Sequence, residues 1–179
     1  MRFRYSLTVD SRMSIIMDSP VRLSTCRFHN FESLTLSNPD RILWPILHYQ
    51  SGVTYDDGPW QAYKRVNELF ADAIADAASS GVLIWVHDYH LMLLPELLRN
   101  RLQKQGKACA IGFSLHTPFP AGDFWRNLPV RKHLIEGLLA SDLIGFHTDE
   151  YKQNFIDTCA SLMYVEYRVH VCSRLGTDS

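Results

Sequence analysis

The sequence lacks the motifs by which several common classes of protein bind their ligands. It contains neither GxGxxG nor GxxxxGK[ST], so no glycine-rich loop is expected to grip a diphosphate. It has no CxxC pair and no HExxH, which are spacings typical of zinc sites. No apolar run approaches the roughly 18–20 residues that span a bilayer. The N-terminal stretch also lacks the uninterrupted apolar core of a secretory signal.

Charge of either sign is nearly balanced, with 18 Lys and Arg against 19 Asp and Glu. No surface for nucleic acid or for an anionic membrane is therefore expected. The four cysteines form no close pair, and two of them lie in apolar surroundings typical of buried free thiols. We expect a protein of the reducing cytoplasm. The cysteines are Cys26, Cys109, Cys159 and Cys172.

With 179 residues, the chain has the length of one domain. Residues 1–40 show no sustained period of 2 or 3.6, so weak order is expected there. From residue 41 to residue 171, helical stripes alternate with continuous apolar runs that are typical of strands buried on both faces. This alternation predicts an α/β fold with a Rossmann-like parallel sheet. Strands are expected at 82–86, 108–115, 143–146 and 167–171, and helices at 59–78, 91–102, 130–140 and 150–163.

Histidines follow three of the expected strands, at the point where each strand ends. His87 follows the first strand, His116 the second and His147 the third, and Asp88 and His90 stand close behind His87. Ligands of an open α/β sheet bind at the carboxyl ends of the strands. Because loops at strand ends are polar and solvated, core filling does not explain three histidines there. We therefore expect the functional site at this edge.

Each of these residues also has a plain structural interpretation. His87 or His90 taken alone is more often a structural histidine, and Asp88 is equally suited to cap the helix that follows. Residues 147–149 are favoured as an N-cap cluster. His116 has the weakest structural interpretation, because it precedes a Pro-x-Pro turn that rigidifies its loop.

Two further alternatives concern the ligand. Three histidines and an aspartate could bind zinc in a metal-dependent hydrolase. Because His87 and His90 do not share a helical face at i and i+4, we predict no metal site. Trp44, in Leu43-Trp44-Pro45, could pack on the apolar face of a sugar ring or could anchor a loop to the core. The sequence leaves both roles of Trp44 open.

Five blocks of the sequence resemble the signature blocks of the trehalose-6-phosphate synthases, glycosyltransferase family 20. They occur in the family's order and with compatible spacing, and the match runs from about Arg41 to Met163, over 120 residues. An ordered match of this length is far more specific than a single motif. The blocks are RILWPILHY (41–49), WVHDYHLMLLPELLR (85–99), IGFSLHTPFP (111–120), LPVRK (128–132) and SDLIGFHT (141–148).

The resemblance implies a GT-B fold, in which two Rossmann-like domains face each other across a cleft and this chain forms the acceptor-side half. It implies transfer of glucose from UDP-glucose to glucose 6-phosphate with retention of configuration, and with no cofactor or metal. At the matching positions, Trp44 is implied to line the acceptor pocket and Asp88 to bind acceptor hydroxyls. His116 is implied to stabilise the reacting centre beside the transferred glucose. The departing UDP phosphate is implied to deprotonate the acceptor, so no protein base is needed.

The chain departs from the family pattern at both ends. The family's N-terminal Arg and glycine-rich loop are absent from residues 1–40, so this segment is expected to be divergent, ahead of the acceptor-side domain at 41–171. The Arg, the Lys and the acidic segment of the family's donor domain are also absent, and 172–179 is expected to be a truncated tail. We therefore expect a fragment that is inactive alone. The alternative is a non-catalytic interaction or regulatory module that binds other subunits of a trehalose synthase complex.

Overall fold

The computed structural model describes residues 4–10, 13–18, 39–50, 52, 54–126, 128–163 and 171–173. Within this part, six strands form one sheet whose order follows the chain, β1-β2-β3-β4-β5-β6. β3 to β6 are parallel, and β1 and β2 form an antiparallel pair that joins the sheet through β2 and β3. The strands are β1 (Arg4–Asp10), β2 (Met13–Asp18), β3 (Leu83–His87), β4 (Ala110–Ser114), β5 (Leu143–Phe146) and β6 (Val171–Ser173).

Helices connect the parallel strands, which confirms the predicted α/β class. The 21 residues of α3 form the longest helix described, and Asp56 caps its N-terminus by accepting from the amide of Gly58. No helix of the described residues has both the length and the apolar character to cross a membrane. The helices are α2 (Pro39–Leu47), α3 (Asp57–Ala77), α4 (Leu94–Lys104), α5 (Gly122–Trp125), α6 (Arg131–Leu139) and α7 (Asp149–Met163), with a 3₁₀ turn, η1 (Tyr89–Leu91).

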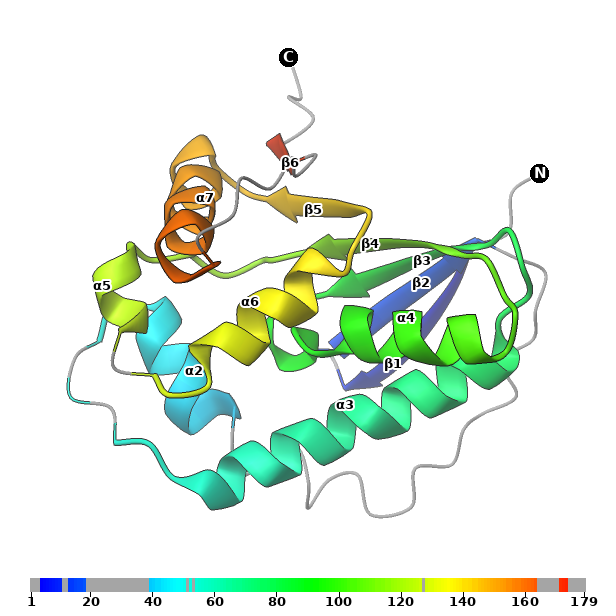
Figure 1. Ribbon diagram of the computed structural model, residues 1–179, viewed down its shortest axis with the longest axis horizontal. Coiled ribbons are helices and arrows are strands. Elements are labelled where there is room, and N and C mark those ends of the chain that lie inside the picture. The colour runs from blue at the N-terminus through cyan, green and yellow to red at the C-terminus, as the bar shows by residue number, and fades with distance from the viewer. Residues whose placement is uncertain are drawn as a thin grey trace.

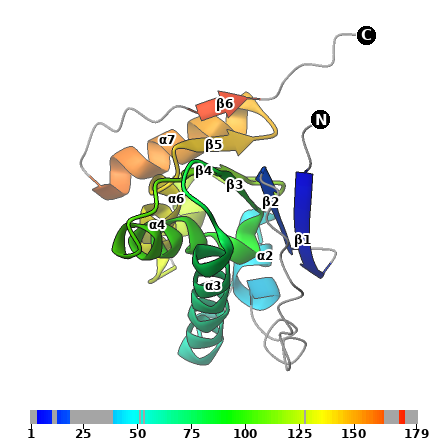
Figure 2. The same cartoon turned by 90° about the vertical axis from the view of Figure 1, so that its right-hand side faces the viewer.

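Only one face of the parallel strands is fully buried, whereas the continuous apolar runs predicted burial on both faces. In β3, Ile84 and Val86 are fully buried, but Leu83 is 37% exposed and Trp85 is half-buried. The reason is topological: the crossovers from β3 to β6 all step in the same direction, so their helices gather on one side of the sheet (Figure 2).

The less buried face has a tryptophan where the neighbouring strand has a glycine. The indole of Trp85 on β3 lies over Gly112 on β4, so close that a Cβ at Gly112 would stand 3.0 Å from the ring. The indole nitrogen of Trp85 donates a 2.8 Å hydrogen bond to the hydroxyl of Ser114. The wide indole of Trp85 therefore covers the adjacent strand, and the one polar atom of the indole is hydrogen-bonded.

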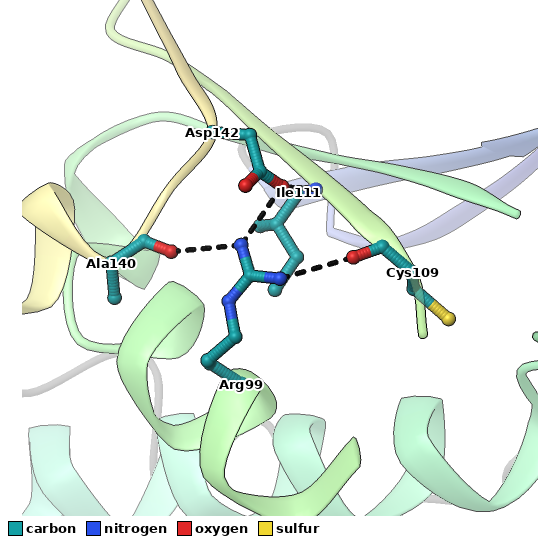
Figure 3. Close-up of polar contacts among 5 residues, drawn as sticks. All are labelled: Arg99, Cys109, Ile111, Ala140 and Asp142. Carbon is teal, nitrogen blue, oxygen red and sulfur yellow. Dashed lines mark hydrogen bonds and ion pairs between the residues drawn. The ribbon is translucent and has the colours of Figure 1, made fainter. Parts of the chain in front are cut away.

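Arg99 of α4 ties the beginnings of two parallel strands together (Figure 3). Its guanidinium donates to the carbonyl oxygens of Cys109 and Ala140, each at 3.1 Å, and to the carboxylate of Asp142 at 2.8 Å. That carboxylate also accepts from the amide of Ile111 at 2.7 Å. One planar cation thus holds β4, the end of α6 and the start of β5 in register.

The structure differs from the sequence analysis at three places. Residues 1–40 were expected to lack regular structure, but β1 and β2 lie there, and RYSLTVD (4–10) does alternate polar and apolar residues over its short length. Trp44 lies on helix α2, not in a loop, because Pro45 is tolerated inside that short helix. α5 was not predicted, since four residues show no period. Most of the strand expected at 167–171 falls outside the described residues.

Candidate functional site

The histidines at the carboxyl edge of the sheet form a hydrogen-bonded row. β3, β4 and β5 point the same way, toward the side on which α2 and α5 lie (Figure 1). His87 Nδ1 lies 2.9 Å from His116 Nε2, and His116 Nδ1 lies 3.2 Å from His147 Nε2. The rings of His87 and His116 are stacked, and that of His147 meets His116 edge-on. Three residues that are far apart in sequence thus form one unit.

The row runs from a half-buried ring to exposed ones. His87 is half-buried, whereas His116 and His147 are exposed. Burial lowers the pKa of His87 below its ordinary value, the neighbouring His116 lowers it further, and the carboxylate of Asp88 acts in the opposite direction. His87 is therefore neutral at neutral pH.

Asp88 has a backbone conformation that is rare for a residue with a side chain. Its φ of 69° and ψ of 168° fall in a region used almost only by glycine, where other residues are strained by about 1–3 kcal/mol. Its amide donates to the carbonyl of Ser114 at the end of β4, and its carboxylate accepts from the amide of Tyr89. The capping role considered for Asp88 is therefore real, and strain of this kind is typical of functional positions.

Two side chains of α3 hold the turn that follows Asp88. The hydroxyl of Tyr63 donates to the carbonyl of Tyr89 at 2.7 Å and accepts from the amide of Met92 at 2.9 Å. The amide of Asn67 donates to the carbonyl of His90 at 3.0 Å. Both side chains are buried, and burial raises the pKa of Tyr63, so its hydroxyl stays protonated. These hydrogen bonds anchor the backbone of η1 and of the residue after it to helix α3.

Sequence reasoning missed this support. In the sequence, Tyr63 and Asn67 are simply two positions of the helix expected at 59–78, and nothing assigns them a hydrogen bond. A polar residue one turn after Tyr63, on the same buried face, was the available signal, because buried amides are almost always hydrogen-bonded.

Trp44 lies beside this turn with its ring accessible. It is 43% exposed, which excludes the role of a core anchor. Its ring stacks on His48 at 3.8 Å between centroids and lies 5.8 Å from the ring of Tyr89, the residue after Asp88. Tyr49, the next exposed aromatic residue, stands edge-on to Phe124. Trp44 of α2 therefore presents an exposed flat ring beside Tyr89, the residue that follows the strained aspartate.

The remaining residues of the edge have structural roles. His90 is buried and packs on the ring of Tyr89, so it does not belong to the histidine row. Thr148 caps α7 by accepting from the amide of Tyr151 at 3.2 Å, as expected for residues 147–149, although His147 joins the row. Among the described residues, no three His, Cys, Asp or Glu side chains are grouped so that they could hold a metal ion.

The arrangement is suited to the hydroxylated ring of a sugar ligand. An exposed indole can pack on the apolar face of a sugar ring, a carboxylate can accept from its hydroxyls, and imidazoles can hydrogen-bond at the reacting atoms. The three predicted site residues are linked through direct neighbours, since Trp44 contacts Tyr89, Asp88 follows His87, and His87 bonds to His116.

Comparison with known proteins agrees with the resemblance in the sequence. A family model, Glycosyltransferase family 20, matches residues 9–176. The chain is 54% identical over 123 residues to an alpha,alpha-trehalose-phosphate synthase (UDP-forming) of Emericella nidulans, a match that covers 68% of this chain and 24% of that protein. The chain thus spans only a quarter of the length of the curated relatives it matches.

Solved structures share the fold. An E. coli structure, described as trehalose-6-phosphate bound with UDP-2-fluoro glucose, is 32% identical with a TM-score of 0.68, over 75% of this chain and 32% of that chain. A synthase from Burkholderia xenovorans in complex with glucose-6-phosphate is 34% identical with a TM-score of 0.63, over 69% of this chain and 27% of that chain.

Proposed function

Because the chain belongs to glycosyltransferase family 20, we propose that it forms the acceptor-side part of a retaining glucosyltransferase with a GT-B fold. The reaction is transfer of glucose from UDP-glucose to glucose 6-phosphate, giving trehalose 6-phosphate and UDP. The names of the relatives and the molecules bound to the solved structures support this choice of substrates.

Asp88 and Trp44 are proposed to bind the acceptor sugar. The observation that carries the proposal is the strained backbone of Asp88, held by Tyr63 beneath it and by Ser114 beside it. Asp88 lies at the carboxyl edge of the sheet, where ligands of an α/β fold bind, and backbone strain of this kind clusters at functional sites. Trp44 supplies the flat apolar surface on which the pyranose packs.

His116 is proposed to stabilise the reacting centre. A transition state with oxocarbenium character is stabilised by dipoles that are already oriented when charge develops. The ring of His116 is held on two sides by His87 and His147, so its orientation is fixed before the substrate arrives. In this mechanism the UDP phosphate removes the acceptor proton.

Because the chain spans about a quarter of the length of its curated relatives, the 179 residues are proposed to supply one wall of the cleft. A cleft enzyme needs both walls to orient two substrates, so the chain alone is expected to bind without turnover. Further subunits of a trehalose synthase complex could supply the other wall. Two buried free thiols, Cys109 and Cys159, are consistent with a location in the reducing cytoplasm.

The test combines a binding measurement and an assay. Glucose 6-phosphate binding to the purified chain is measured by calorimetry, with Asp88→Asn as the site variant. UDP release from UDP-glucose is measured with and without the acceptor, with His116→Ala as control. Binding that is weakened in Asp88→Asn supports the site, and absence of binding contradicts it. Acceptor-dependent turnover by the chain, lost in His116→Ala, would support the reaction and refute the need for a second wall.

A further inference from the structure

The three histidines of the row are joined nitrogen to nitrogen, which couples their protons. A hydrogen bond between two imidazole nitrogens needs one N–H and one lone pair, so each junction holds one proton. A neutral imidazole carries one proton in total. Since each junction pairs Nδ1 of one ring with Nε2 of the next, all three rings must carry the proton on Nδ1, or all three on Nε2.

The buried end of the row decides between these two states. His87 Nε2 is buried and has no hydrogen-bond partner within the described part of the chain. A proton there would be an unpaired buried donor, and such donors are costly and rarer than unpaired acceptors. His147 is exposed, so an N–H on its Nδ1 can donate to water. The state with all protons on Nδ1 leaves no donor unpaired.

We propose that His87 is a positioning residue that holds the proton of His116 on Nδ1. His87 Nδ1 donates to His116 Nε2 and so keeps a proton off that nitrogen. His116 Nδ1 donates in turn toward His147, and the hydrogen bonds of the row run one way, from the half-buried ring to the solvent. The lowered pKa of His87 agrees with a neutral ring at this end.

The direction of the row determines what His116 offers to a ligand, a consequence that rests on the proposed function. Of its two hydrogen bonds, the one to His147 is the longer, at 3.2 Å, and it ends on an exposed ring. A sugar oxygen that replaces His147 then meets an N–H group. His116 therefore acts on the sugar as a hydrogen-bond donor and not as an acceptor.

The test is nitrogen-15 NMR of the chain with labelled histidine, at an alkaline pH at which imidazole is neutral. In the wild-type chain, we expect Nδ1 to carry the proton in His87, His116 and His147. In His87→Phe, which keeps a flat ring but removes the donor, His116 is expected to return to Nε2–H, the tautomer that an unconstrained histidine favours. His147→Phe is the matched control, and His116 keeps its proton on Nδ1 there because His87 still donates.

A proton on Nε2 of His116 in the wild-type chain would overturn the proposal, and so would an unchanged His116 tautomer in His87→Phe. The wild-type spectrum alone is decisive where His87→Phe does not fold. None of these outcomes depends on substrate. Failure to bind glucose 6-phosphate would count against the proposed function and would leave the tautomers as measured.

Discussion

The hydroxyl group of Tyr63 donates a 2.7 Å hydrogen bond to the carbonyl oxygen of Tyr89, across 26 residues of chain. The same hydroxyl accepts from the amide of Met92. A single oxygen on α3 therefore satisfies both ends of the turn that follows Asp88.

Replacing Tyr63 with Phe should lower the free energy of unfolding by about 1–3 kcal/mol, because a buried amide and a buried carbonyl lose their partner. Chemical denaturation measures this. Tyr55→Phe is the control, because the Tyr55 hydroxyl bonds only to the exposed Asp57 in the described structure. Equal effects of the two variants would mean that the buried bonds add nothing.

Asp88→Ala and Asp88→Asn should distinguish the contribution of Asp88 to stability from its contribution to ligand binding. Ala keeps the positive φ and loses the cap on Tyr89, so we expect a loss of about 0.5–2 kcal/mol of stability. Asn tolerates positive φ and still accepts a hydrogen bond, so stability should stay within about 0.5 kcal/mol. Both variants lack the carboxylate and should bind glucose 6-phosphate more weakly. If binding follows stability instead, Asp88 is a structural residue.

Arg99→Lys should destabilise the protein by about 1–2 kcal/mol although the charge is kept, because an ammonium cannot reproduce the planar fork on Cys109, Ala140 and Asp142. Arg65→Lys is the matched control. Arg65 is 62% exposed and pairs with Glu68 at 3.5 Å, so we expect a change within about 0.5 kcal/mol. Thermal melts of both variants measure this effect. Equal shifts of the melting temperature in the two variants would contradict the prediction.

Gly137→Ala should destabilise the protein by about 1–3 kcal/mol, although Ala is the better helix former. A Cβ at Gly137 in α6 would overlap with the carbonyl oxygen of Met92. Gly58→Ala, near the start of α3, is the comparison, because its Cβ would meet only a carboxylate oxygen of Asp56 at 3.6 Å. Stabilisation by Gly137→Ala would mean that α6 can move away from the turn.

Stability should fall as the pH is lowered through the ordinary pKa of 6.5 for histidine, in part because of His87. The pKa of His87 is lower in the folded state, where burial and His116 lower it and Asp88 opposes them. Between the folded pKa and 6.5, the unfolded state binds more protons, so the free energy of unfolding decreases with falling pH. In His87→Phe this slope should be shallower. The free energy of unfolding is measured from denaturation curves at several pH values. If its dependence on pH is the same in His87→Phe as in the wild-type chain, His87 is not a cause of that dependence.

The long helices and the strands from 57 to 163 were predictable because their signals are local, whereas the short elements η1 and α5 were not. Long apolar stripes and continuous apolar runs identify α3 and the parallel strands from the sequence alone. β1 and β2 were missed because seven alternating residues are a weak pattern, and their pairing with β3 is a tertiary effect. α2 was missed because Pro45 is usually read as a break in a helix.

The site was predictable at the level of which residues share an edge, because strand ends converge in a parallel sheet. The sequence could place His87, His116 and His147 together, but not the hydrogen bonds between their rings, which depend on side-chain rotation. The positive φ of Asp88 was also invisible, because the hydrogen bonds around it join residues that are distant in sequence: Asp88 donates to Ser114, and Tyr63 bonds to the turn that follows Asp88.

The strand order that follows chain order has a consequence for how the protein is made. Each of β4, β5 and β6 pairs with the parallel strand that precedes it in the chain, so no pairing among β3 to β6 must wait for a strand beyond the next one. Each of these pairings needs only the connection between two consecutive strands to be complete. The sheet from β3 to β6 can therefore grow one strand at a time while the chain leaves the ribosome. Each new strand adds to the edge formed by the strand before it.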